Sequence, residues 1–228
     1  MKQAFFITGT DTDVGKTTVA AGLLHAARRR GWRTAAAKPL ASGCAATPWG
    51  LRNADALALQ AECWPALPYE LINPRAFAPA IAPHVAAREA GVELTLAGLC
   101  HDVQRVLDRG AELTLVEGAG GWRVPLCDDA YLSDLAVALD LPVVLVVGMR
   151  LGCLNHALLT AQAIRADGLQ LAGWVANQVD PRMPRLEENL AELRARLPAP
   201  CVGFVPRLAR PGAASVAEHL LLGVLAGR

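Results

Sequence analysis

The feature that most constrains the fold is a loop between an apolar run and an amphipathic segment. The apolar run Phe5–Thr8 leads into GTDTDVGKTT, residues 9–18, which opens a helical pattern over Lys16–Arg30. In such a unit, glycines let backbone N–H groups turn toward phosphate oxygens, and the helix start adds positive potential. A lysine at Lys16 reaches the outer phosphates, and the Thr17 hydroxyl is suited to bind Mg²⁺. The sequence therefore predicts a nucleotide-binding loop at the first strand–helix junction.

The rest of the chain alternates short apolar runs with helical patterns, which predicts a parallel sheet flanked by helices. The proline-rich stretch Pro65–Pro83 predicts irregular loop with at most short turns. We expect one α/β domain over residues 1–228, a three-layer sandwich with a mostly parallel sheet. Further strands are predicted over Thr34–Lys38, Leu113–Glu117, Pro142–Gly148, Leu171–Asn177 and Val202–Val205, and helices over Asp55–Glu62, Leu96–Leu107, Leu132–Leu139, Asn155–Ala166, Leu186–Leu197 and near Ser215–Leu222.

Composition excludes several classes of protein. With 53% hydrophobic residues, 19% charged residues and a net charge of +1, the chain is neither disordered nor equipped with a basic nucleic-acid groove. The longest strongly apolar stretch, Leu141–Met149, is far shorter than a membrane-spanning helix. The six cysteines are scattered without a Cys-x-x-Cys pair, which predicts reduced thiols and no zinc site. We expect a cytoplasmic protein with no membrane or nucleic-acid partner.

Ligands of parallel sheets bind beyond the carboxyl ends of the strands, so the residues there are the candidate site. Only three of the 22 cationic residues are lysines, and two of them, Lys16 and Lys38, lie at such positions. A lysine in so arginine-rich a chain suggests chemistry that needs a compact ammonium. For Lys38, a simple ion pair with a nearby carboxylate is the alternative interpretation.

Later strand ends add further polar groups. Glu117 ends an apolar strand before a glycine-rich turn, a pattern typical of an acid that holds Mg²⁺ directly or through water. Asp55, taken alone, is a helix-start carboxylate. Asn155 is a candidate helix cap that leaves N–H groups free for an anion. Asn177 and Gln178 end another apolar strand.

Together, these motifs resemble the dethiobiotin synthetases, the ATP-dependent ring-closing enzymes of biotin synthesis. Five residues rather than the usual four separate Gly9 from Gly15, and this longer loop is similar to the form the family has. The resemblance implies a P-loop NTPase-like fold. The matching segments are Thr8–Thr18, Lys38–Gly43, Thr47–Asp55, Val116–Trp122, Leu151–His156 and Ala172–Asn177.

The resemblance also implies the reaction. The substrate 7,8-diaminononanoate takes up CO₂ to form a carbamate, ATP phosphorylates the carbamate, and the second amine closes the ureido ring and releases phosphate. Mg²⁺ is the implied cofactor. The implied assembly is a homodimer with the substrate at the subunit interface, where helix-start amides of the partner chain bind the substrate carboxylate.

Residue roles follow from the same resemblance. It implies catalytic roles for Lys16, Lys38 and Thr12, and metal binding by Thr17, Asp55 and Glu117. Substrate contacts are implied for Ser42, Gly152, Cys153 and Asn155. ATP contacts are implied for Asp13, Val14, Gly15, Lys16, Thr17, Thr18, Asp55, Glu117, Gly118, Ala119, Gly120, Asn177, Gln178, Pro206, Arg207 and Leu208.

The chain departs from the family pattern in three places. Gln178 replaces an acidic residue that often follows the strand-end asparagine. A substrate-side tyrosine expected within Met183–Leu193 is absent, and Asn189 is the nearest equivalent. The segment after Pro206 matches poorly. None of these departures touches the phosphate or metal positions.

Two alternatives remain. The ATP-dependent amidation enzymes of cobalamin synthesis resemble this domain at the phosphate loop, but they carry a glutamine-hydrolysing domain for which this chain is too short. The dimeric switch ATPases of cell division and partitioning resemble the fold, but they carry an extra lysine early in the loop, where this chain has Gly9-Thr10-Asp11. A requirement of ATP turnover for a small amine separates these classes.

Overall fold

A six-stranded parallel sheet forms the centre of the molecule. The computed structural model describes residues 2–225, in which the sheet has the order β12-β11-β10-β1-β7-β2. All neighbouring strands in it are parallel, and β1 lies between β7 and β10. The strands are β1 (Gln3–Gly9), β2 (Thr34–Ala37), β7 (Leu113–Glu117), β10 (Val143–Gly148), β11 (Leu171–Asn177) and β12 (Cys201–Val205).

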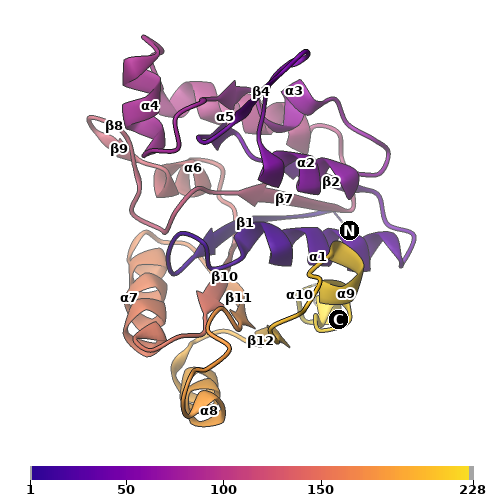
Figure 1. Ribbon diagram of the computed structural model, residues 1–228, viewed down its shortest axis with the longest axis vertical. Helices are drawn as coiled ribbons and strands as arrows, with labels where there is room; N and C mark the ends of the chain where they lie inside the picture. Colours follow the sequence, from indigo (N-terminus) through magenta and orange to yellow (C-terminus); the bar gives the residue numbers. More distant parts are fainter. Residues whose placement is uncertain (1, 226–228) are drawn as a thin grey trace.

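Helices cover both faces of this sheet and complete three layers (Figure 1). Along β1, Phe6 packs into one hydrophobic cluster while Phe5 and Ile7 pack into the other, as the period-two alternation of strand side chains requires. The cluster around Phe6 includes residues of α4 to α8, and the opposite cluster includes residues of α1, α2, α9 and α10. The helices are α1 (Lys16–Arg28), α2 (Ala54–Ala61), α3 (Tyr69–Ile72), α4 (Pro83–Glu89), α5 (Leu96–Leu107), α6 (Ser133–Ala138), α7 (Cys153–Ala166), α8 (Leu186–Arg196), α9 (Ala213–Ala217) and α10 (Leu222–Leu225).

The predicted α/β sandwich with a parallel sheet is confirmed. The ends of its predicted strands lie within two residues of the observed ends. Three short pairings were not predicted. Strand β3 (Leu40–Ala41) pairs with β6 (Arg75–Ala76), β4 (Ala45–Thr47) with β5 (Gly50–Arg52), and β8 (Pro125–Cys127) with β9 (Ala130–Tyr131).

The proline-rich stretch is largely irregular, as predicted, with the single-turn helix α3 and the two-residue strand β6 inside it. Helix α4 begins at its last residue, Pro83, which fits a helix start because that position needs no N–H donor. Two other local predictions were wrong. Helix α7 is capped by Gly152, and Asn155 lies inside its first turn. The last predicted helix is two short ones, because the intervening Leu221 N–H donates to Val202 O of the edge strand at 2.7 Å.

All six cysteines are free thiols, as predicted. Within residues 2–225, the structure has no helix with the length and apolar character needed to cross a membrane.

Candidate active site

The loop after β1 has, at Gly15, a backbone conformation that residues with a side chain rarely adopt. Gly15 has φ +88°, and a Cβ there would lie 2.2 Å from Asn177 Nδ2. The Asn177 amide donates instead to Val14 O at 2.8 Å, so the end of β11 binds the loop backbone. Gly15 therefore allows the close approach of β11 that fixes the loop.

The other side of the loop is tied to the end of β10. The Gly148 N–H donates to Thr10 Oγ1 at 3.2 Å, and the Arg150 guanidinium pairs with the Asp11 carboxylate. The predicted nucleotide-binding loop is thus bracketed by the ends of β10 and β11, at the edge of the sheet where ligands of such folds bind.

Lys16 begins α1 and is buried in the loop that it follows. Its Nζ donates to Asp11 O at 2.9 Å, so a backbone carbonyl accepts from the ammonium. Burial lowers the pKa of Lys16 against the opposing effect of nearby carboxylates. A phosphate group would supply a much stronger partner for this ammonium than a neutral carbonyl does.

Lys38 follows β2 and is enclosed by two carboxylates. Its Nζ lies 2.6 Å from Glu117 Oε1 and 3.1 Å from Asp55 Oδ2, and only 5% of its side chain is exposed. Burial alone would lower the pKa of Lys38, but the two carboxylates outweigh it and raise the pKa. The ion pair that the sequence left as the alternative for Lys38 is present, and it lies in the same cavity as the phosphate loop. A role of Lys38 in the chemistry stays a prediction.

Glu117 has one satisfied and one unsatisfied oxygen. Its Oε1 accepts from Thr17 Oγ1 at 2.8 Å and from Lys38, whereas its buried Oε2 has no hydrogen-bond partner among the described residues. A buried carboxylate oxygen without a partner is costly, and a cation would satisfy it.

The metal-binding prediction fits this chemistry. Oxygen donors of Thr17, Asp55 and Glu117 converge through their contacts with each other or with Lys38, and Mg²⁺ prefers oxygen ligands. Across residues 2–225, no three His, Cys, Asp or Glu side chains cluster closely enough to hold a metal alone. A metal here would depend on oxygens from a bound nucleotide, as Mg²⁺ commonly does.

These side chains line one cavity of about 390 Å³. It brings together predicted residues from four strand ends and from the start of α2, including the candidate substrate residue Ser42. Asn53, which sequence reasoning did not select, also lines it. The lining is Thr12, Asp13, Gly15, Lys16, Thr17, Thr18, Lys38, Ala41, Ser42, Asn53, Asp55, Glu117, Ala119 and Gly120.

A second cavity of about 270 Å³ shares Asp13, Gly15 and Thr18 with the first. The predicted nucleotide residues Asn177, Gln178, Pro206, Arg207 and Leu208 line it, together with Val179, Val205, Ala209 and Pro211. Gln178 Oε1 accepts from the Arg207 N–H at 3.2 Å, which joins the ends of β11 and β12. The poorly matching tail after Pro206 therefore forms one wall.

Other predicted residues lie outside these two cavities. Val14 is buried behind the loop, and Gly118 packs against the Phe6 ring, where a Cβ would lie 3.0 Å from Cζ. Gly152, Cys153 and Asn155, at the start of α7, line neither cavity. The structure does not bring these last three together with Lys38.

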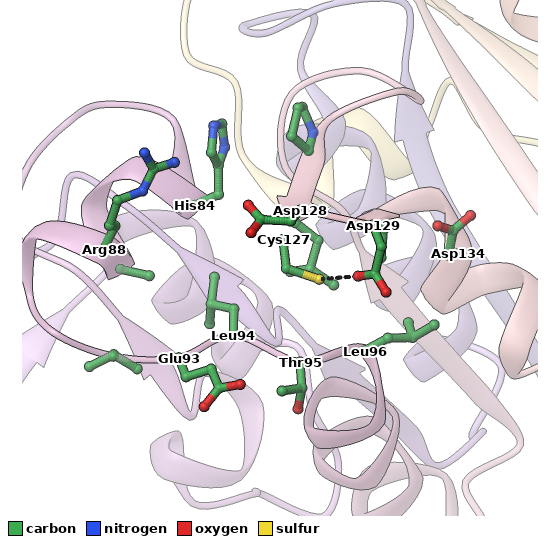
Figure 2. A pocket seen from close by; sticks show the side chains of 15 residues that line it. His84, Arg88, Glu93, Leu94, Thr95, Leu96, Cys127, Asp128, Asp129 and Asp134 are labelled. Atoms are coloured by element: carbon green, nitrogen blue, oxygen red, sulfur yellow. Dashed lines mark hydrogen bonds between the residues drawn. The ribbon is translucent and has the colours of Figure 1, made fainter.

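A larger cavity of about 1140 Å³ lies apart from this chemistry, between α4 and the β8–β9 hairpin (Figure 2). Asp128, Asp129 and Asp134 lie on one side of it, with His84 and Arg88 on the other, and Cys127 Sγ donates to Asp129 Oδ1 at 3.3 Å. It contains none of the strand-end lysines, so its size does not make it the candidate site.

The fold and the loop together define an α/β protein of the P-loop nucleotide-binding class. Solved structures share this fold. A chain of the MinC:MinD cell division protein complex of Aquifex aeolicus aligns at TM-score 0.60 and 15% identity, over 98% of this chain and 94% of that chain. The signal recognition particle receptor FtsY of Elizabethkingia anophelis, in complex with GDP, aligns at TM-score 0.54 and 15% identity. This chain spans 64% of that FtsY chain.

Sequence similarity defines the family. Residues 3–214 match a family described as an AAA domain. The ATP-dependent dethiobiotin synthetase BioD of Pseudomonas paraeruginosa is 70% identical over 217 residues, 95% of each chain. Proteins of the same name from Cellvibrio japonicus and Xanthomonas campestris are 60% and 50% identical, each over 96% of this chain and 96% and 97% of their own lengths. The chain belongs to the ATP-dependent dethiobiotin synthetase family, a family of ligases, and the resemblance found in its motifs is confirmed.

Proposed function

We propose that residues 1–228 act as a single cytoplasmic enzyme domain that converts 7,8-diaminononanoate, CO₂ and ATP into dethiobiotin, ADP and phosphate. The observation that supports this most is the burial of Lys38 between Glu117 and Asp55, in the same cavity as the phosphate-loop lysine. A nucleotide-binding site alone needs Lys16. A second buried ammonium facing the same cavity suits a second anion, here a carbamate.

The proposed reaction has three steps. One amine of the substrate attacks CO₂ and loses a proton, which gives a carbamate. A carbamate oxygen attacks the γ-phosphorus of ATP, ADP leaves, and a carbamic-phosphoric anhydride forms. The second amine then attacks the carbonyl carbon, loses a proton and expels phosphate, which closes the ureido ring. Holding that amine near the activated carbonyl is the main task of the substrate site.

Each side chain of the cavity has a proposed part in these steps. The Lys16 ammonium leaves the Asp11 carbonyl and neutralises the outer phosphates. The Lys38 ammonium stabilises the carbamate anion. Thr12 and Ser42, which line the same cavity, orient the substrate.

The nucleotide lies across both cavities in this proposal. Its phosphates bind the loop from Asp13 to Thr18, with Ala119 and Gly120 beside them, and its adenine occupies the cavity lined by Asn177, Gln178 and the Pro206–Leu208 segment. Val14 and Gly118 support these contacts from behind.

The residues present also fit Mg²⁺. Thr17, Glu117 and Asp55 would hold it, and the free Oε2 of Glu117 supports that assignment. Bound there, Mg²⁺ would neutralise charge that develops on the transferring phosphoryl group. The role of this chain is to keep Glu117 and Thr17 in contact at 2.8 Å, which presents two oxygens side by side.

The start of α7 has a proposed role in a homodimer. N–H groups in the first turn of a helix lack acceptors within the helix and attract anions. Gly152, Cys153 and Asn155 lie at this start and do not line the cavity of their own chain. We place them in the substrate site of a partner chain, where they bind the substrate carboxylate.

The test is phosphate release from MgATP and bicarbonate, measured with and without 7,8-diaminononanoate, with mass detection of the product. Release that depends on the diamine, together with a cyclic urea, is the expected result. Hydrolysis of ATP at the same rate without the diamine, and no cyclic product, would contradict the proposal and favour a switch ATPase of the same fold.

A further inference from the structure

Two buried polar residues lie beneath the site without lining its cavity. Tyr69 begins α3, and Asn73 is its C-terminal cap. Tyr69 is 6% exposed and Asn73 is 3% exposed. Neither lines the cavity that contains Lys38. Buried polar side chains need hydrogen-bond partners, and the partners of these two lead directly to the candidate catalytic residues.

The first partner is the backbone of Lys38. Asn73 Nδ2 donates to Lys38 O at 2.7 Å, and the Lys38 N–H donates to Ile72 O at 2.8 Å. Both polar groups of the Lys38 backbone are therefore bound by consecutive residues of one segment. The Tyr69 hydroxyl donates to Asn73 Oδ1 at 2.9 Å, which orients the Asn73 amide.

The second partner is the start of α2. The Tyr69 hydroxyl also accepts from the Asn53 N–H at 2.7 Å. Asn53 caps α2 by accepting from the Ala56 N–H at 3.1 Å, and two residues further along the chain the Asp55 carboxylate lies 3.1 Å from Lys38 Nζ. One hydroxyl thus joins the segment that carries the ammonium to the helix that carries its carboxylate.

The ring of Tyr69 is held independently of its hydroxyl. The Arg52 guanidinium lies 4.2 Å from the ring centroid and pairs with Glu70 at 2.8 Å. Burial raises the pKa of Tyr69, so the hydroxyl keeps the proton that it donates to Asn73 at neutral pH. Replacement by phenylalanine would remove the two hydrogen bonds and leave the stacked ring in place.

We propose that Tyr69 and Asn73 are positioning residues for the reaction: they fix Lys38 and the Asp55-bearing helix start at the separation that the carbamate site needs. The proposal rests on the function proposed above for Lys38. It assigns these two residues to the chemistry of the carbamate and not to binding by the phosphate loop, since their hydrogen bonds reach the Lys38 carbonyl and the Asn53 N–H at the cap of α2 and do not reach that loop.

The test compares Tyr69→Phe with the unmodified chain in diamine-dependent phosphate release. We expect kcat per nucleotide-binding site to fall about tenfold or more, because a buried hydroxyl is lost and small displacements of catalytic groups are costly in rate. The affinity for an ATP analogue, measured without Mg²⁺, should remain unchanged, because no hydrogen bond of this network reaches the phosphate loop. Titration with the analogue counts competent sites, so a smaller folded fraction alone cannot mimic the loss.

Tyr131→Phe is the matched control, since Tyr131 is 45% exposed and its ring lies 5.6 Å from the Arg123 guanidinium. It should retain full activity. Asn73→Ala removes the other half of the network and should show the same selective fall in kcat. If Asn73→Ala does not fold, Tyr69→Phe still decides the matter.

A kcat for Tyr69→Phe within about twofold of the unmodified chain would overturn the inference, given that one hydrogen bond of this kind is expected to be worth more. An equal loss in kcat and in nucleotide affinity would overturn it as well, because it would indicate a general disturbance. An unmodified chain that releases no phosphate in response to the diamine would contradict the proposed function itself, and would be seen before any variant is compared.

Discussion

The two cavity lysines are held by different kinds of partner, and this difference indicates different tasks. Lys16 donates to a neutral carbonyl and has a lowered pKa, whereas Lys38 lies between two carboxylates and has a raised pKa. An ammonium bound to a carbonyl is readily taken over by an anion. An ammonium held by carboxylates keeps its charge and its position until those carboxylates bind another partner.

The geometry around Lys38 makes its replacement by arginine a sharp test. Lys38→Arg keeps the charge, but the planar guanidinium does not fit a point 2.6 Å from Glu117 inside a buried site. We expect diamine-dependent phosphate release to fall about a hundredfold or more, by comparison with the loss of other preorganised charge stabilisers. Binding of an ATP analogue, measured by calorimetry, should persist. Lys2→Arg on the exposed surface is the control, and full activity of Lys38→Arg would remove Lys38 from the mechanism.

A buried thiol predicts a pH dependence of stability. Burial raises the pKa of Cys63 from 9.0 to about 11. Between these values the unfolded chain loses this proton while the folded chain keeps it, so the free energy of unfolding falls as pH rises. The contribution is up to about 3 kcal/mol for a shift of this size. Urea unfolding from pH 8 to 11 should show a shallower decline in Cys63→Ala than in the unmodified chain, and identical slopes would contradict the prediction.

Residues at strand ends could be selected from sequence, because the end of an apolar run fixes their place in a parallel sheet. Lys38 and Glu117 were found in this way, 79 residues apart, and the structure joins them at 2.6 Å. Asn53, Tyr69 and Asn73 could not be found by that reasoning. Their role depends on a hydrogen-bond network whose partners come from three separate elements. No local sequence pattern indicates such a network.

At the scale of elements, the loop between β1 and α1 is the best predicted and the most constrained. Its neighbours at the ends of β10 and β11 hold it through Thr10, Asp11 and Val14. Gly15 lies where Asn177 approaches, so the close packing of loop and strand depends on the absence of a side chain.

Gly15→Ala tests that close packing. The new Cβ would lie 2.2 Å from Asn177 Nδ2, and the positive φ adds strain. We expect loss of ATP-analogue binding in calorimetry together with a lower melting temperature. Gly31→Ala is the matched control, because Gly31 has φ +78° and no atom within 4 Å of the added Cβ. That control should lose about 1–2 kcal/mol from backbone strain and still bind nucleotide. Retained nucleotide binding in Gly15→Ala would contradict the prediction.

The elements that were not predicted from the sequence are those whose hydrophobic residues show no helical or strand periodicity. Helix α4 begins at Pro83 after a run of prolines that favours loop, and α3 is a single turn stabilised by the contacts of Tyr69 and Asn73. The long helix α5 and the strand β7, which carry clear periodicity, were predicted with their observed bounds.

At the scale of the whole molecule, the proposed homodimer places residues of one chain in the site of the other. Lys38→Arg and Asn155→Asp should then each be defective, the latter because its carboxylate repels the substrate carboxylate. When the two variants are unfolded together and refolded as a mixture, half of the dimers should contain one chain of each variant. Each such dimer has one intact site and one defective site, so the mixture should regain roughly a quarter of normal activity. Refolding each variant alone is the control. No recovery in a mixture shown to be dimeric would contradict the shared site.

The order of the strands also governs when the site can exist during synthesis. The hydrogen bond from Thr17 to Glu117 spans 100 residues of sequence, and the one from Asn177 to Val14 spans 163. The phosphate loop is among the first segments to leave the ribosome. Its partners Glu117 and Asn177 follow on the order of ten seconds or more later, since synthesis adds roughly 5–20 residues per second. A nascent chain therefore carries its nucleotide motif without a nucleotide site for most of translation, and ATP can stabilise the fold only after the sheet is nearly complete.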